Sequence, residues 1–358
     1  MQGLSSTELF RRDLAERPVL FEEEHSGARK VILNRPSKLN SLNLETVSQM
    51  FSKLKMYEDD PAVNVVILKG NGKGFCAGGD VFQNICSMLT GHWSFGASFY
   101  KKQLTLDHLI ATYKKPLVCL INGVVMGGGA GISMHASFRV VTEKTVFAMP
   151  EAILGLFPDV GASHFLSKLP GHFGEYLGLT GARLDGETML ACGLATHFVL
   201  SKDLPLLEHA LASVDSPNAS EIESVINKCA RKSSAKEEEL HKRLERINKC
   251  FSRQTVEGIL HCLEEELVDN LAEKWIAEAV NSMKSASPTS LKITLRAGSR
   301  AIFFDRGQKP KWEPPKLELV GAETVEMLFK ALEDDDDWSC LQLPDRSSNV
   351  LDQARSKL

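Results

Sequence analysis

Apolar residues gather in short runs along the first half of the chain. Five of these runs are rich in Val, Ile and Leu and end at polar residues or glycine: residues 30–34, 64–70, 116–123, 138–143 and 146–149. Runs of this length and composition predict β-strands. Near-continuous apolar strands are typical of a sheet that is covered on both faces. The pattern therefore predicts an α/β core over residues 18–200.

Helical spacing of apolar residues appears in two places. Leu44, Val47, Met50 and Leu54 recur at helical intervals between the first two predicted strands. From about Asp203 onward, charged residues interleave with Leu, Ile and Val, as in "EEELHKRLERINKCF". We expect three parts: the core, a helical region over residues 201–332, and a flexible tail over residues 333–358 that opens with the solvated run "EDDDD".

Charge and composition exclude several functions. The chain has 42 basic and 46 acidic residues and a net charge of −4, so no global field draws it onto nucleic acid. No run of eighteen apolar residues occurs, so no transmembrane helix is expected. The eight cysteines are scattered without a CxxC pair. We interpret them as reduced packing thiols and expect no metal site.

The two ends of the chain bear on its destination. The first 25 residues lack the apolar core of a signal peptide and are too acidic for a typical mitochondrial presequence. The chain ends in Ser356, Lys357 and Leu358, and this tripeptide is an address that the peroxisomal import receptor reads. The sequence therefore predicts a peroxisomal protein with the import receptor as a partner.

Two glycine clusters follow predicted strands. They are "GKGFCAGGD" at residues 72–80 and "NGVVMGGGAG" at residues 122–131. Neither matches a P-loop or the GxGxxG pattern of dinucleotide folds. Glycine turns that open a helix leave free N–H groups, and two such turns can aim two N–H groups at one oxygen, as in an oxyanion hole. Cys76 lies inside the first cluster. No histidine or other base occurs at a sequence spacing that would indicate a catalytic cysteine, so we interpret Cys76 as a packing residue.

Two acids, Glu151 and Asp159, lie in the apolar stretch "VFAMPEAILGLFPD" at residues 146–159. A buried carboxylate without a partner is costly, so the pair demands an explanation. Acids of this kind are often salt-bridged or cap a helix, and from the residues alone this structural interpretation stays open beside a catalytic one.

The order of these motifs resembles the crotonase superfamily of enoyl-CoA hydratases and isomerases. "FCAGGD", "NGVVMGGGAG" and "MPEAILGLFPDVGA" carry the resemblance, with "NRPSKLNSLN" before them and "LTGARLDGETMLACGLATHFV" after them. The closest likeness is to 3-hydroxyisobutyryl-CoA hydrolases of the plant peroxisomal type. The resemblance implies a spiral of ββα units, a homo-oligomer, and hydrolysis of a small β-hydroxyacyl-CoA thioester, as in valine catabolism. Coenzyme A would be part of the substrate, and no other cofactor is expected.

The resemblance also assigns roles to single residues. The backbone N–H groups of Gly79 and Gly128 would hold the thioester carbonyl. Glu151 would be the catalytic carboxylate and Asp159 its partner at the acyl group, while Gln103 would line the acyl pocket. Whether Glu151 acts as a base or as a nucleophile is left open. Asp159 would hold the β-hydroxyl of the substrate and orient Glu151.

The chain departs from the family pattern in two places. Position 103 is Gln where these hydrolases usually have Glu, which puts the substrate preference in question. A few dozen residues are missing near residues 296–310, where the family has a further helical stretch. Two alternatives therefore stay open: an enoyl-CoA hydratase or isomerase, and a non-catalytic acyl-CoA-binding homologue. A hydratase would need a second glutamate on the helix after the glycine run, and that position is Gly131.

Overall fold

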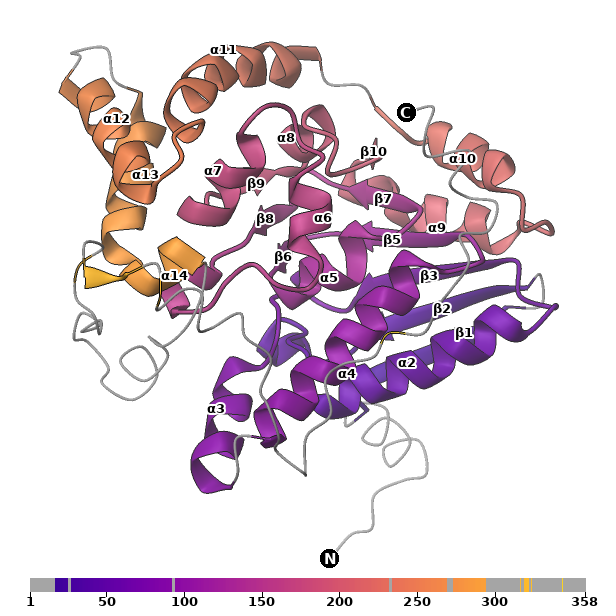
Figure 1. The fold of residues 1–358 in the computed structure, drawn as a ribbon. Helices are drawn as coiled ribbons and strands as arrows, with labels where there is room; N and C mark the ends of the chain where they lie inside the picture. The colour runs from indigo at the N-terminus through magenta and orange to yellow at the C-terminus, as the bar shows by residue number, and fades with distance from the viewer. Residues whose placement is uncertain are drawn as a thin grey trace, which may run out of the picture.

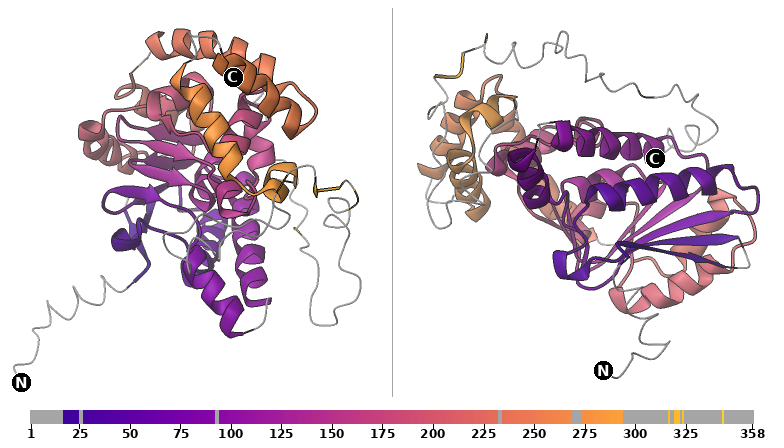
Figure 2. Two further views of the ribbon diagram at one scale, coloured as in Figure 1. Left: turned by 90° about the vertical axis from the view of Figure 1, so that its left-hand side faces the viewer. Right: turned by 90° about the horizontal axis from the view of Figure 1, so that it is seen from below.

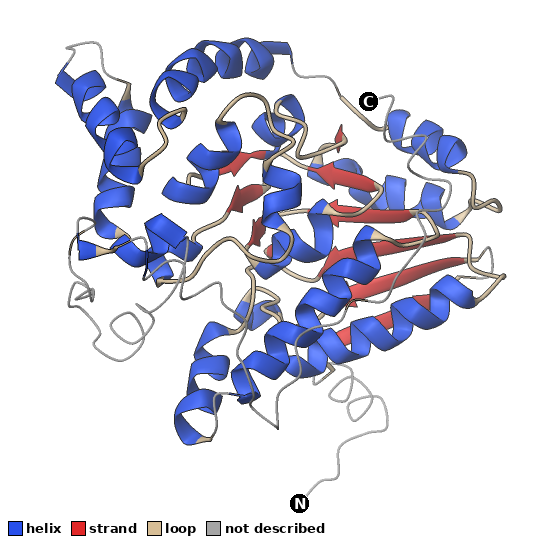
Figure 3. Ribbon diagram, in the orientation of Figure 1, coloured by secondary structure: helices blue, strands red, loops and turns tan. Residues whose placement is uncertain are grey.

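The computed structural model describes residues 17–24, 27–91, 94–231, 234–268 and 273–293, with a few isolated positions beyond (Figure 1). Strands and helices alternate up to residue 198, and helices follow from residue 204 (Figure 3). The C-terminal tripeptide and the site of the missing residues lie outside the described part. The domain boundaries at residues 200 and 332 stay a prediction.

Two sheets form the centre of the molecule. The larger sheet has the strand order β1-β2-β3-β5-β7-β10, and only β1 and β2 in it are antiparallel. Its strands are β1 (Val19–Glu23), β2 (Ala28–Leu33), β3 (Val65–Gly70), β5 (Leu117–Ile121), β7 (Phe138–Val141) and β10 (His197–Phe198). The smaller sheet has the order β4-β6-β8-β9, with strands β4 (Gly74–Cys76), β6 (Val124–Met126), β8 (Val146–Ala148) and β9 (Leu184–Asp185).

The larger sheet is buried on both faces, as its apolar runs predict. In β3, Val66 and Leu68 belong to the main core, whereas Val65 and Ile67 belong to a second core on the opposite face. Alternate residues of a strand point to opposite faces, so a strand between two cores must be apolar throughout. The second core is closed by two helices, α9 (Leu204–Ala212) and α10 (Ala219–Asn227).

Helices cover the remaining faces of the two sheets (Figures 1 and 2). The predicted helix after residue 44 forms α2 (Leu44–Asp59), which begins where the Asn43 side chain accepts a hydrogen bond from the Thr46 N–H. The other helices of the first part are α3 (Val81–Thr90), α4 (Ser94–Ala111), α5 (Gly128–Met134), α6 (Ala162–Leu166), α7 (Phe173–Thr180), α8 (Gly186–Ala191) and the short 3-10 helix η2 (Glu151–Leu154).

The chain repeats one path three times: a strand of the larger sheet, a strand of the smaller sheet, then a helix. The strand pairs are β3 with β4, β5 with β6, and β7 with β8. Strands β4, β6 and β8 are parallel neighbours, so their carboxyl ends meet at one edge of the smaller sheet. This spiral brings together three turns that are far apart in the sequence, and it confirms the predicted fold class.

The C-terminal helices form a separate layer beside the smaller sheet (Figure 1). They contact α7, α8 and η2. The Ser287 N–H donates to the Ala152 carbonyl at 3.3 Å, so this layer supports the 3-10 helix that begins at Glu151. The layer comprises α11 (Ser234–Phe251), α12 (Val256–Val268), α13 (Lys274–Ser285) and α14 (Pro288–Ile293). Among the described helices, none combines the length and the apolarity needed to cross a bilayer.

Candidate active site

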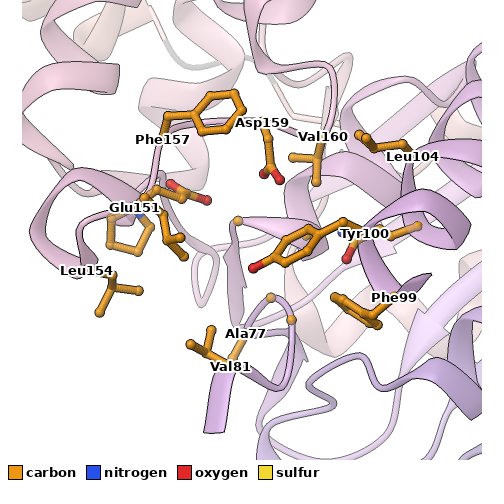
Figure 4. A pocket seen from close by; sticks show the side chains of 17 residues that line it. Ala77, Val81, Phe99, Tyr100, Leu104, Glu151, Leu154, Phe157, Asp159 and Val160 are labelled. Atoms are coloured by element: carbon orange, nitrogen blue, oxygen red, sulfur yellow. The ribbon is translucent and has the colours of Figure 1, made fainter. Parts of the chain in front are cut away.

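A cavity of about 350 Å³ opens at the edge where β4, β6 and β8 end. All five residues that the resemblance singles out line it: Gly79, Gln103, Gly128, Glu151 and Asp159. The other lining residues are mostly apolar: Ala77, Gly78, Val81, Phe99, Tyr100, Leu104, Gly127, Pro150, Leu154, Leu156, Phe157 and Val160. Figure 4 shows Glu151 and Asp159 pointing into this space, with the side chains of α4 across from them.

The first glycine turn follows β4 and is anchored by the segment before α2. The Leu42 N–H donates to the Gly78 carbonyl at 2.8 Å, and the Asp80 N–H donates to the Leu42 carbonyl at 2.7 Å. The guanidinium of Arg35 also binds the Asp80 carboxylate at 2.9 Å. Among the described residues, no backbone carbonyl accepts from the Gly79 N–H. The Gly79 N–H therefore remains available, while hydrogen bonds to Leu42 hold Gly78 and Asp80 on either side of it.

The second glycine turn follows β6 and lies directly against the first. A Cβ added to Gly78 would stand 3.5 Å from the Gly128 nitrogen. Gly128 is the first residue of α5, so its N–H has no acceptor within the helix. The two glycine turns thus meet at the cavity, and the N–H groups of Gly79 and Gly128 are the donors that an oxyanion hole there would use.

Glu151 reaches this place because it begins η2 directly after β8. Its carboxyl group packs against the second turn: a Cβ added to Gly127 would lie 2.7 Å from the Glu151 Oε1. The other oxygen, Oε2, has no hydrogen-bond partner among the described residues. Burial is the main cause that raises the pKa of Glu151 to about 8, and the nearby charge of Asp159 is the second.

Asp159 is the more acidic member of the pair. Burial raises the pKa of its carboxyl to about 6. Neither Glu151 nor Asp159 has a salt-bridge partner within the described part of the chain. The structural interpretation of the pair as salt-bridged groups therefore finds no support here. At neutral pH the Asp159 carboxyl is mostly ionised while Glu151 holds a proton in most molecules.

Helix α4 supplies the opposite wall. Gln103 is buried, and no described residue forms a hydrogen bond with its Nε2. A Cβ at Gly128 would lie 2.3 Å from that nitrogen, so the side chain of Gln103 touches the second turn. Tyr100 lies one turn earlier on α4. Burial and the charges of Asp159 and Glu151 raise the pKa of its hydroxyl to about 12, so it remains a proton donor.

Asp107 is a third acid beside the cavity, one turn beyond Gln103 on α4. It is buried, and neither carboxyl oxygen has a hydrogen-bond partner among the described residues. Burial raises its pKa well above the usual range, and the charge of Asp159 adds to the effect. The sequence does not predict Tyr100 or Asp107, because only the packing of α4 against the glycine turns brings them close to the acids.

Cys76 and Gly131, which the sequence also singles out, both lie near the candidate site. Cys76 is buried, and burial raises the pKa of its thiol to about 12, so it stays a neutral packing group. Gly131 faces Val160: a Cβ there would lie 2.6 Å from the Val160 Cβ. No side chain fits at position 131, and a second glutamate of the hydratase kind has no room. The described residues hold no cluster of three or more potential metal ligands.

Comparison with known proteins assigns this chain to one family. Residues 28–299 match the family model described as enoyl-CoA hydratase/isomerase. The structure is similar to a carnitinyl-CoA dehydratase from Mycobacterium thermoresistibile (TM-score 0.78, 28% identity, 89% of this chain and 98% of the other). It is equally similar to an enoyl-CoA hydratase from Rhodobacter sphaeroides 2.4.1 (TM-score 0.78, 29% identity, 88% and 98%). The chain belongs to the enoyl-CoA hydratase/isomerase family and has the crotonase fold.

The relatives with higher sequence identity are more specific. A probable 3-hydroxyisobutyryl-CoA hydrolase 3 from Arabidopsis thaliana is 42% identical, with 94% of this chain and 97% of the relative covered. The mitochondrial 3-hydroxyisobutyryl-CoA hydrolase of Homo sapiens is 37% identical, with 89% and 90% covered. Within the family, the chain groups with these hydrolases, as its sequence motifs predict. The Arabidopsis alignment spans 369 positions, more than the 358 residues of this chain, so this chain carries gaps in it.

Proposed function

We propose that this protein hydrolyses the thioester of 3-hydroxyisobutyryl-CoA or a related small β-hydroxyacyl-CoA, as in valine catabolism. The names of its relatives support this class of substrate. The observation that carries the proposal is the meeting of three groups at one cavity: the Gly79 N–H, the Gly128 N–H and the carboxyl of Glu151, which has one oxygen without a partner. This combination suits acyl transfer to water.

The proposed mechanism follows from the placement of these groups. The thioester carbonyl oxygen would accept hydrogen bonds from the two glycine N–H groups, which stabilise the negative charge that develops there. Glu151 would take a proton from water while the water oxygen bonds to the carbonyl carbon. Collapse of the tetrahedral intermediate breaks the carbon–sulfur bond, and the proton held by Glu151 passes to the departing thiolate. The products are a free carboxylic acid and coenzyme A, and the residues named here supply each step.

Glu151 could carry out the same reaction as a nucleophile, through a mixed anhydride with the substrate. A single turnover in ¹⁸O-water, followed by mass analysis of the peptide that contains Glu151, separates the two routes. Label in the Glu151 carboxyl means that an anhydride formed and was hydrolysed at the glutamyl carbon. A general base leaves the label in the acid product alone.

Asp159 and Gln103 would recognise the β-hydroxyl of the substrate. Asp159 ionises before Glu151, so it can accept a hydrogen bond at neutral pH. We expect Asp159→Asn to raise the KM for 3-hydroxyisobutyryl-CoA about tenfold, because an amide accepts this bond more weakly than a carboxylate. The KM for isobutyryl-CoA, which lacks the hydroxyl, should stay within about twofold. Equal changes for both substrates would remove Asp159 from hydroxyl recognition.

Release of free thiol from a panel of acyl-CoAs tests the whole proposal. The expected result is turnover of small β-hydroxyacyl-CoAs that resists a chelator, since the proposed chemistry uses neither a metal nor another cofactor. Binding of acyl-CoA with no turnover would instead support a non-catalytic homologue. Hydration of an enoyl-CoA would support a hydratase, which the crowded position of Gly131 disfavours.

For the location of the protein, we propose the peroxisome. Ser356, Lys357 and Leu358 carry this proposal, with the import receptor as the partner that reads them. The related animal hydrolases carry the name mitochondrial, so the two organelles are the alternatives to compare. A fluorescent fusion with a free C-terminus should be punctate and peroxisomal, and deletion of the tripeptide should make it cytosolic. The same mitochondrial pattern for both fusions would reject the address.

A further inference from the structure

The turn that carries Asp159 has an unfavourable backbone. Val160, the next residue, has φ +48°. This left-handed conformation is rare for a β-branched residue and costs about 1–3 kcal/mol, so it persists only where the surroundings hold it in place. The turn lies at the cavity, since Asp159 and Val160 both line it. The structure around Val160 must therefore supply the contacts that hold the turn.

His135 makes one of these contacts. It is the C-cap residue of α5 and is buried behind the cavity. Its Nε2 lies 3.1 Å from the Val160 carbonyl oxygen. A carbonyl oxygen only accepts hydrogen bonds, so the Nε2 of His135 must carry the hydrogen. The imidazole also packs closely against Gly161, the residue after Val160. A Cβ added to Gly161 would lie 2.4 Å from the His135 Nε2.

A second contact comes from the same helix. The Val160 side chain packs over Gly131 so closely that a Cβ there would lie 2.6 Å from the Val160 Cβ. Helix α5 thus holds the turn at two points, at Gly131 and at His135. The same helix begins at Gly128, which lines the cavity. Helix α5 therefore determines where Asp159 lies relative to Gly128.

We infer that His135 is a positioning residue for the acyl-CoA reaction. By donating a hydrogen bond to the strained turn at Val160, it fixes the place of the Asp159 carboxyl. The effect on catalysis rests on the proposed role of Asp159 in recognising the β-hydroxyl. His135 lines a different cavity from Asp159 and is not among the residues that line the candidate active site.

The first test compares two replacements of His135. His135→Leu removes the donor, and His135→Gln can place an N–H near the position of Nε2. We expect His135→Leu to raise the KM for 3-hydroxyisobutyryl-CoA by about tenfold and to leave the KM for isobutyryl-CoA within about twofold, because a displaced positioning contact typically costs about 10–100-fold. His135→Gln should recover most of the loss. His164→Leu is the control, because His164 is an exposed neighbour of His135. The centroids of the two rings lie 5.9 Å apart.

A second pair of variants disturbs the same contact from the turn. Gly161→Ala would drive a methyl group into the His135 ring. Gly193→Ala is the matched control: Gly193 has φ +84°, close to the +76° of Gly161, but nothing lies within 4 Å of its added Cβ. Both variants carry similar backbone strain. Only Gly161→Ala should produce the substrate-dependent rise in KM, and this pair decides the question if His135→Leu does not fold.

A readout without turnover separates this inference from the proposed function. The ¹³C signal of the Asp159 carboxyl, assigned by its loss in Asp159→Asn, reports the pKa of that group. In His135→Leu this pKa should fall from about 6 toward the ordinary value of an aspartate, because the released carboxyl turns to water. An unchanged pKa and an unchanged KM in folded His135→Leu would overturn the inference. A lowered pKa in a protein that releases no thiol would support it and reject the hydrolase.

Discussion

Replacement of Glu151 by Gln is expected to lower the rate of thiol release by about 10²–10⁴-fold, the usual contribution of a general base. The amide keeps the shape of the side chain but cannot take a proton from water. In the wild-type protein, kcat/KM should rise with pH up to about 8, because the active form of Glu151 is the carboxylate and its pKa lies there. The variant should lose this rise. Binding of acyl-CoA, measured by calorimetry, should change little.

The same replacement should stabilise the protein. Glu151 has a folded-state pKa of about 8, above its ordinary value of 4.5, so the folded chain keeps a proton that the unfolded chain releases. The free energy of unfolding therefore falls as the pH rises between these values, and Gln has no such dependence. At pH 8 the variant should be more stable by about 4 kcal/mol, and near pH 4 the difference should vanish. Thermal melting across this range measures both effects.

Normal turnover in Glu151→Gln would mean that the two acids are structural and that this assignment is wrong. A second outcome is that Glu151→Gln loses turnover but melts at the same temperature as the wild type at every pH. This outcome would support the catalytic role of Glu151 and contradict its raised pKa. It would place the carboxyl in contact with water that lowers its pKa.

The second large effect is expected at the first glycine turn. Gly79→Pro removes the N–H that faces the cavity, and loss of one oxyanion donor typically lowers the rate by about 10²–10³-fold. The loss should fall on kcat more than on KM, because the donor acts most strongly on the charge of the transition state. No described backbone carbonyl uses this N–H, so the substitution removes no backbone hydrogen bond from the fold.

Gly79→Ala provides the control for this variant. Alanine keeps the N–H, and its Cβ would lie 3.3 Å from the ring of Phe99, which can shift slightly. We expect the alanine variant to keep most of its activity and the proline variant to lose it, with similar melting temperatures. A folded Gly79→Pro protein with near-normal kcat would exclude Gly79 from the reaction.

The sequence predicts five of the ten described strands, because the signal of these five is local. They are β2, β3, β5, β7 and β8. The apolar runs at residues 64–70 and 116–123 correspond to β3 and β5, with ends displaced by no more than two residues. Each run contains its own evidence: β-branched residues inside and polar or glycine residues at the ends. The pattern does not predict β4 and β6, which lie inside the two glycine clusters and have only three residues each.

The wall formed by α4 could not be predicted in the same way. Tyr100 and Asp107 are more than forty residues from Glu151, and nothing in their local sequence links them to it. Their relation depends on how α4 packs against the start of α5, which is a property of the tertiary structure. Gln103 was found through the family resemblance and not from the residues themselves. Burial, which raises the pKa of Asp107, is also visible only after folding.

The start of α5 restricts how this protein can change during evolution. Its glycines are each closed in by a different neighbour. They are Gly127, Gly128, Gly129 and Gly131, and they meet Glu151, Gln103, Cys76 and Val160 in that order. Any single substitution there adds a side chain against a group of the site or of its support, so this segment has almost no room for neutral drift. New substrate preferences must therefore arise on α4 and on the loop after η2, where residues such as Leu104 and Leu156 line the cavity with side chains that can be exchanged.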